Sequence, residues 1–184
     1  MLHKTLIEMV FLKGDPAKRI KNNNSSIYSI ILVMVAGGIH GLTLFCFRGE
    51  ALVGELNYYY LVFFILFGYL YMVTSQLGIT LMLWAMCRIL KGLPKFFTLF
   101  SVLGHAILPY GLMVSTLTYW QTLTDPTLAT FISLLFAALI FGALFVYSLV
   151  KVVALMQTFS YKKSIVCVAL LLIFFGSFVY VFGY

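Results

Sequence analysis

The polar side chains with the most chemical capacity lie inside apolar stretches: His40, Gln76, His105 and Tyr110. Counted at about 1.5 Å of rise per residue, the two histidines and the glutamine fall near mid-depth of a bilayer. An imidazole or amide there needs a partner, because hydrocarbon offers none. These groups could bind a polar solute, or hydrogen-bond helix to helix at about 0.6 to 2 kcal/mol per contact. Two histidines without a third ligand make a poor zinc site, so we favour the helix contacts and expect no metal.

A proline and three glycines are expected to shape the helices around these groups. Pro109 has no N–H to offer the carbonyl four residues earlier, that of His105, which predicts a kink and a free acceptor beside the imidazole. Gly37 and Gly41 form a GxxxG pattern, and Gly104 adds a small residue further along, which favours close helix packing over a hinge. If these helices pack together, the carbonyl, the imidazole and the glutamine amide form one polar seam.

Nothing else in the sequence suggests catalytic machinery. No H-E-x-x-H, G-x-S-x-G or P-loop pattern occurs, and no nucleophile with an adjacent base can be named. The three cysteines, Cys46, Cys87 and Cys167, lie far apart in or beside apolar stretches and are expected to be small buried apolar residues. We therefore expect a protein that is not an enzyme and carries no cofactor.

The elements that must position these residues are membrane-spanning helices. The chain is 63% hydrophobic and 9% charged, whereas a soluble domain is about half apolar and a quarter charged. A spanning helix needs about 20 apolar residues. We predict an all-α integral membrane protein, a bundle of five transmembrane helices within residues 27–184. Their ranges are about 27–47, 58–87, 96–119, 127–150 and 164–184.

The positive charge is distributed unequally between the two sides of this bundle. Eleven of the twelve Lys and Arg residues fall in the N-terminal segment and in the joints after the second and fourth spans. The cytoplasmic side normally carries this excess, so we expect a multi-pass cell-membrane protein with its N-terminus in the cytoplasm and its C-terminus outside. Arg88, Lys91 and Lys95 form one basic cytoplasmic turn. Residues 1–26 are expected to be a short amphipathic basic segment at the cytoplasmic interface. The basic residues indicate a lipid surface as partner and no nucleic acid.

Two segments resemble the centre of the Yip1 domain. The sequence RILKG at 88–92 resembles the basic, glycine-containing turn between spans two and three of that family. The sequence SVLGHAILPY at 101–110 resembles its Gly-Tyr-Ser-x-x-Pro signature, with Gly104 and Pro109 matching and His105 standing where the family often has tyrosine. The Asp15-Pro16 segment before the first span and the stretch from Tyr147 to Gln157 are also similar to prokaryotic members. The resemblance implies a five-span integral membrane protein, connected in eukaryotes with vesicle transport and membrane shaping.

These observations leave two functional hypotheses. The first is a non-enzymatic membrane-organising or trafficking-type scaffold that binds itself or other membrane proteins. The second is a small-solute or lipid permease that uses the mid-membrane histidine and glutamine groups. Replacement of His105 by tyrosine separates the two hypotheses. A scaffold should tolerate the change, because a phenol can also donate a hydrogen bond, whereas a permease should lose its activity, because a phenol lacks the basicity of imidazole.

Overall fold

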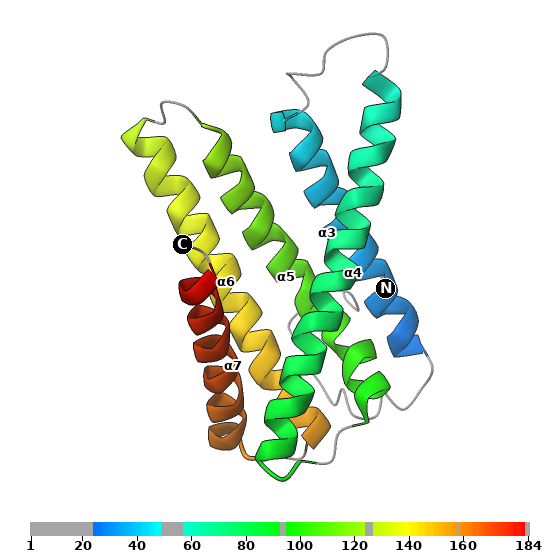
Figure 1. Cartoon of the computed structure of the whole chain (residues 1–184), viewed down its shortest axis with the longest axis vertical. Coiled ribbons are helices and arrows are strands. Elements are labelled where there is room, and N and C mark those ends of the chain that lie inside the picture. The colour runs from blue at the N-terminus through cyan, green and yellow to red at the C-terminus, as the bar shows by residue number, and fades with distance from the viewer. Residues whose placement is uncertain (1–23, 49–56, 93–94, 124–126, 158, 183–184) are drawn as a thin grey trace, which may run out of the picture.

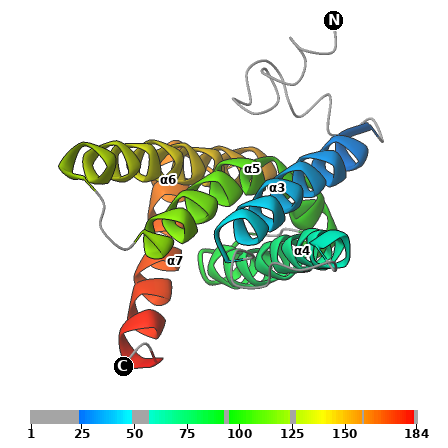
Figure 2. The ribbon, with the colours of Figure 1, turned by 90° about the horizontal axis from the view of Figure 1, so that it is seen from above.

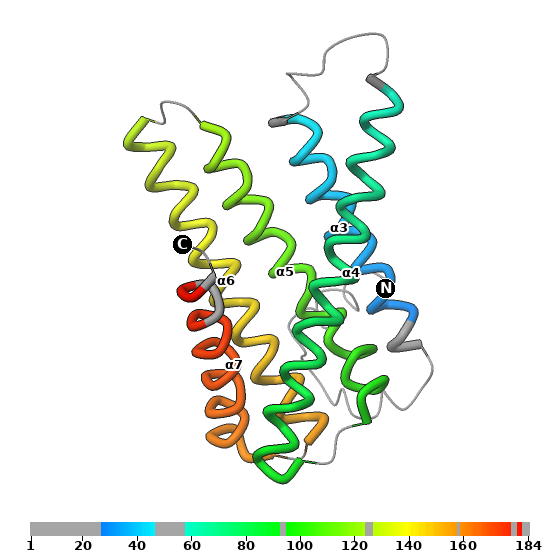
Figure 3. Tube along the Cα trace, viewed as in Figure 1, coloured from blue at the N-terminus to red at the C-terminus, as the bar shows by residue number. Residues whose placement is uncertain are grey.

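The computed structural model of the chain describes residues 24–48, 57–92, 95–123, 127–157 and 159–182. Five long α-helices account for nearly all of them (Figure 1). They are α3 (Asn24–Arg48), α4 (Asn57–Ile89), α5 (Phe96–Thr122), α6 (Leu128–Gln157) and α7 (Tyr161–Phe182). The chain passes up and down between two ends of the bundle, and the end of α4 and the start of α7 lie at the same end (Figure 3).

Four of the described helices, α3 to α6, are long and apolar enough to cross a membrane. An all-helical, membrane-embedded protein is therefore confirmed. The interfacial segment expected at residues 1–26 lies outside the described residues up to position 23, and its last three residues already belong to α3.

The helices extend beyond the apolar stretches that predicted them. The largest difference is at 151–163, where we expected a polar joint. There α6 continues through Lys151 to Gln157, and α7 begins at Tyr161. Hydropathy falls at Lys151, but no glycine or proline follows to end the helix. Val152 and Val153 are fully buried, so packing also favours the added helical turns.

Local hydrogen bonds define where these helices start and stop. The Thr127 hydroxyl accepts from the Thr130 N–H at 3.2 Å, and the Ser160 hydroxyl accepts from the Lys163 N–H at 3.4 Å, as N-caps of α6 and α7. At the end of α4 the Gly92 N–H donates to the Cys87 carbonyl at 2.7 Å, and Lys91 takes a left-handed conformation with φ of 60°. These two features form a Schellman C-cap with lysine at the position that usually holds glycine.

Helix α5 is the centre of the bundle. It contacts α3, α4 and α6, and its residues from Val102 to Ile107 are all buried, so this stretch is enclosed on every face. Seen from above, α3 and α4 lie side by side next to α5, and α6 covers its other side (Figure 2). Helix α7 packs on α6 and α4 near its start, and its far end points away from the other helices (Figure 2).

Candidate functional site

The α3–α4 contact is built on backbone rather than on side chains. A Cβ atom placed on Gly41 would lie 2.5 Å from the Phe64 carbonyl oxygen and 2.7 Å from the Ile65 Cα. One placed on Gly37 would lie 2.9 Å from the Tyr69 Cα. Gly68 of α4 faces the backbone of both α3 glycines. The GxxxG pattern thus lies where two helix backbones touch, and only glycine fits there.

The α3–α5 contact uses small residues in the same way. A Cβ atom on Gly104 would overlap the Ser29 hydroxyl and lie 3.0 Å from the Ser29 carbonyl oxygen. A Cβ atom on Gly111 would lie 2.8 Å from the Cβ of Ala36. Pro109 is buried between these two contacts, and α5 continues through it as one helix. Because α3 meets α4 on one face and α5 on another, these three helices form a tightly packed unit.

Gln76 joins α4 to α5 within this unit. Its side-chain nitrogen donates to the Phe100 carbonyl at 2.6 Å, and its own backbone carbonyl accepts from the Thr80 hydroxyl at 2.6 Å. The Gln76 side chain is buried. It therefore connects two helices through a backbone acceptor near the start of α5.

His105 is bonded within its own helix. Its Nδ1 lies 3.0 Å from the Val102 carbonyl oxygen, and the residue is buried beside Gly104. The sequence led us to expect its imidazole and carbonyl to meet the Gln76 amide. The amide instead contacts Phe100, five residues earlier in the helix.

His40 and Tyr110 belong to a second polar group further along α5. The His40 Nδ1 lies 3.4 Å from the Ser115 hydroxyl, and its ring stacks at a tilt on Tyr71 with the centroids 4.9 Å apart. The Tyr110 hydroxyl is within hydrogen-bonding reach of Tyr71 and Ser75, and its ring packs on Phe145. Tyr71 therefore connects the His40 and Tyr110 side chains.

The four polar residues singled out from the sequence thus fall into separate groups. The α5 partners of Gln76 and His40 are Phe100 and Ser115, which are about 22 Å apart along the helix axis. The Gln76 amide bonds to a backbone carbonyl, and the His40 imidazole contacts a hydroxyl. Such an arrangement holds helices in register and suits a structural role.

The basic end of the bundle carries Arg88, Lys91 and Lys95, all of them exposed. Arg88 lies over the Trp84 ring with its Cζ 5.1 Å from the centroid, and Lys163 lies over the Phe159 ring at 4.1 Å. These cations are positioned at the end of the apolar bundle, where their stems cover aromatic surface and their charges can face lipid headgroups.

A lateral groove of about 470 Å³ opens between α4, α5 and α7. Tyr71 and Tyr110 line it, together with Thr74 and Gly78 of α4 and Phe175 of α7. A Cβ atom placed on Gly78 would have no neighbour within 4 Å. This glycine therefore differs from those at the α3 contacts, because none of the described helices packs against it.

Sequence reasoning missed several residues of these contacts. Tyr71 and Ser75 are one helical turn apart on α4, and that spacing was the available signal for a polar stripe on this helix. The sulfur atoms of Cys87 and Cys167 lie 3.5 Å apart and both residues are fully buried, although 80 residues separate them in sequence. Cys46 is exposed rather than buried, because it lies on the outer face of α3 near the end of that helix.

No protein-family model, curated protein or solved structure matches this chain.

Proposed function

We propose that the protein is a non-enzymatic membrane scaffold, similar to Yip1-domain proteins, that binds a transmembrane helix of another membrane protein or of a second copy. The observation that carries this proposal is the open Gly78 in the groove between α4, α5 and α7. Because glycine has no side chain, a partner helix can approach the α4 backbone closely at this point.

Thr74 and Gly78 have the small-xxx-small spacing that brings membrane helices together. The same spacing at Gly37 and Gly41 is already occupied by α4. The groove adds aromatic side chains, Tyr71 and Phe175, that can pack around a helix. Its volume of about 470 Å³ is suited to a row of side chains from such a helix.

The interior polar groups support a scaffold more than the alternative, a small-solute or lipid permease. Gln76, His40 and His105 each already contact a carbonyl or hydroxyl of the bundle. A transport pathway needs such groups to exchange partners with a solute. Here breaking the Gln76 or His40 contact would loosen the packing of α5 against α4 or α3, and the His105 bond lies within α5 itself.

The proposed setting is a cell membrane crossed five times, with α7 as the last span. The N-terminus and the basic turn at Arg88, Lys91 and Lys95 face the cytoplasm, and the C-terminus lies outside. This orientation rests on the clustering of basic residues at one end of the bundle. Anionic lipid headgroups are the natural partners of that end.

Site-specific photo-crosslinking in native membranes tests the scaffold. A benzophenone amino acid replaces Leu70, which is exposed and lines the groove, or Leu139, which is equally exposed on α6. We expect a discrete crosslinked species from position 70 and none from position 139. Its mass distinguishes a second copy of this chain from another membrane protein.

Two glycine substitutions make this test specific. Gly78→Leu adds a side chain to the groove at a position where a Cβ meets nothing within 4 Å, and Gly176→Leu is the matched control because a Cβ there also meets nothing within 4 Å. The added leucine should overpack the contact with the partner helix by at least about 1 kcal/mol, which weakens the crosslink by about fivefold or more in Gly78→Leu. Gly176→Leu should leave the crosslink unchanged. A crosslink that survives Gly78→Leu, or equal crosslinking from both positions, contradicts the proposal.

A further inference from the structure

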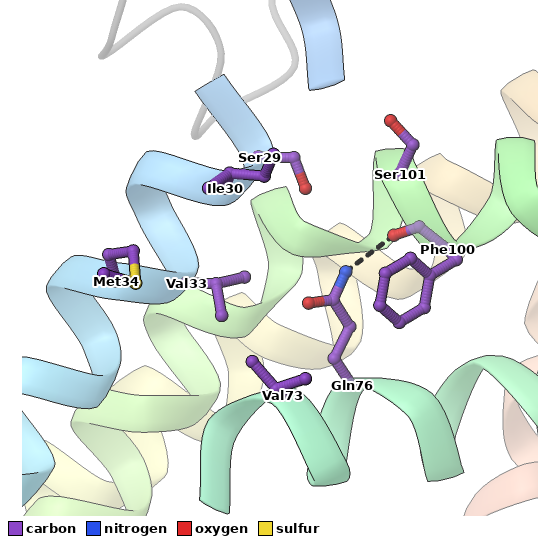
Figure 4. A pocket seen from close by; sticks show the side chains of 8 residues that line it. All are labelled: Ser29, Ile30, Val33, Met34, Val73, Gln76, Phe100 and Ser101. Atoms are coloured by element: carbon purple, nitrogen blue, oxygen red, sulfur yellow. Dashed lines mark hydrogen bonds between the residues drawn. The ribbon is translucent and has the colours of Figure 1, made fainter. Parts of the chain in front are cut away.

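A second pocket, of about 280 Å³, lies on the other side of α4, between α3, α4 and α5 (Figure 4). Three polar side chains line it, one from each helix: Ser29, Gln76 and Ser101. Its remaining wall includes Ile30, Met34 and Val73, which are 62%, 46% and 44% exposed. The pocket therefore combines a polar floor with apolar walls that reach the lipid-facing surface.

The orientation of Gln76 determines what the floor offers to a ligand. A carbonyl oxygen only accepts hydrogen bonds, so the atom that faces Phe100 must be the amide nitrogen. The amide oxygen then points away from Phe100 into the space bordered by Val33 and Val73 (Figure 4). Because Gln76 is only 3% exposed and its amide is held by this bond, the acceptor has a fixed position.

The depth of the floor matches a particular part of a bilayer. Ser29 and Ser101 each come five residues after the first residue of their helix, which places them about 8 Å inward. The headgroup region occupies about 5 to 8 Å on each side of the hydrocarbon. Counted from the starts of α3 and α5, the floor thus lies near the boundary between headgroups and acyl chains, where the hydroxyl groups of uncharged lipids are found. This is shallower than the mid-depth expected for Gln76 from the sequence, because Gln76 contacts Phe100 near the start of α5.

We propose that this pocket binds an uncharged, single-chain bilayer amphiphile whose hydroxyl group donates a hydrogen bond to the Gln76 amide oxygen. None of the described residues that line the pocket is charged, so an ionised headgroup finds no counter-charge among them. A volume of about 280 Å³ is at the lower limit of about 300 Å³ for small-molecule pockets, which suits one chain segment and not a whole phospholipid. This site is independent of the scaffold groove, because the two open on opposite sides of α4.

A matched pair of photoactivatable lipids tests the proposal. The full-length protein in phosphatidylcholine nanodiscs is irradiated with a diazirine-bearing long-chain alcohol or with the methyl ether of the same molecule. The ether has the same chain but no donor. We expect the alcohol to label peptides containing Ile30, Met34 or Val73 about threefold to tenfold more than the ether, which corresponds to one neutral hydrogen bond.

Variants assign this preference to the pocket. Val73→Phe should fill the pocket from its exposed rim and abolish labelling, whereas Leu81→Phe, at an exposed α4 position outside the pocket, should leave it unchanged. Gln76→Met should reduce the preference for alcohol over ether to about one while retaining ether labelling. Equal labelling of the wild type by both probes would overturn the proposal. Labelling that persists in Val73→Phe would also overturn it. A photo-crosslinker at position 34 that links two copies of the chain would show that a second copy occupies the pocket, which would overturn the proposal as well.

Discussion

Replacement of Gly41 by alanine isolates the energy of the close approach between α3 and α4. The new methyl group would lie 2.5 Å from the Phe64 carbonyl oxygen and 2.7 Å from the Ile65 Cα. Both are backbone atoms, so no side-chain rotation can relieve the contact, and the helices must separate. Overpacking of this kind costs about 1 to 3 kcal/mol.

Alanine also stabilises a helix by about 1 kcal/mol relative to glycine, which partly hides that cost. Gly78→Ala removes this ambiguity. Gly78 also lies in an apolar helix, and the Cβ of an alanine there would meet nothing within 4 Å. The free energy of unfolding should therefore increase by about 0.5 to 1 kcal/mol in Gly78→Ala and decrease by up to about 2 kcal/mol in Gly41→Ala.

The difference between the two variants cancels helix propensity and equals the overpacking cost, about 1 to 3 kcal/mol. At about 2 to 4 °C per kcal/mol for a chain of this length, their melting temperatures should differ by about 2 to 12 °C. Thermal unfolding in one detergent, followed by the fluorescence of Trp84 and Trp120, measures this difference. Equal melting temperatures, or a higher value for Gly41→Ala, would refute the backbone contact.

Three further outcomes are expected. Lys91→Gly should stabilise the protein by about 1 kcal/mol, because lysine is strained at φ of 60° whereas glycine is not; Lys91→Ala, which keeps the strain, should give no such gain in a melting experiment. Oxidation with diamide should form a disulfide between Cys87 and Cys167 within one chain, detected by mass spectrometry as a crosslinked peptide that is lost in Cys87→Ser. Absence of this peptide from the wild type would contradict the α4–α7 contact. In an otherwise cysteine-free chain, a membrane-impermeant maleimide applied to intact cells should label Asp125→Cys and not Lys91→Cys, and the reverse pattern would invert the proposed topology.

Hydropathy was sufficient to place the helices because burial in lipid requires long apolar segments with satisfied backbones. It could not place their ends, which depend on caps such as the Thr127 hydroxyl and on packing beyond Lys151. The rotation of each helix was equally inaccessible. A sequence such as α4, apolar on nearly every face, has no periodic signal that identifies its buried side.

The polar contacts illustrate the consequence of that missing rotation. His40, Gln76 and His105 were recognisable from the sequence because a polar group in hydrocarbon needs a partner. Two of their partners, however, are the backbone carbonyls of Val102 and Phe100, which any residue could supply. No residue type marks such an acceptor, so the expected seam could not be divided into its separate contacts before the helices were placed.

The glycines show how geometry adds function to a pattern that sequence alone leaves uniform. Gly41 and Gly78 are both helical glycines in apolar surroundings, and nothing in the surrounding sequence distinguishes them. In the structure, the first touches the α4 backbone and the second faces open space. Close packing explains why the chain would keep the first. The second loses helix stability without gaining an internal contact, at about 1 kcal/mol relative to alanine. A partner helix against Gly78 would offset that loss, which is why the scaffold proposal rests on the glycine that the fold itself does not use.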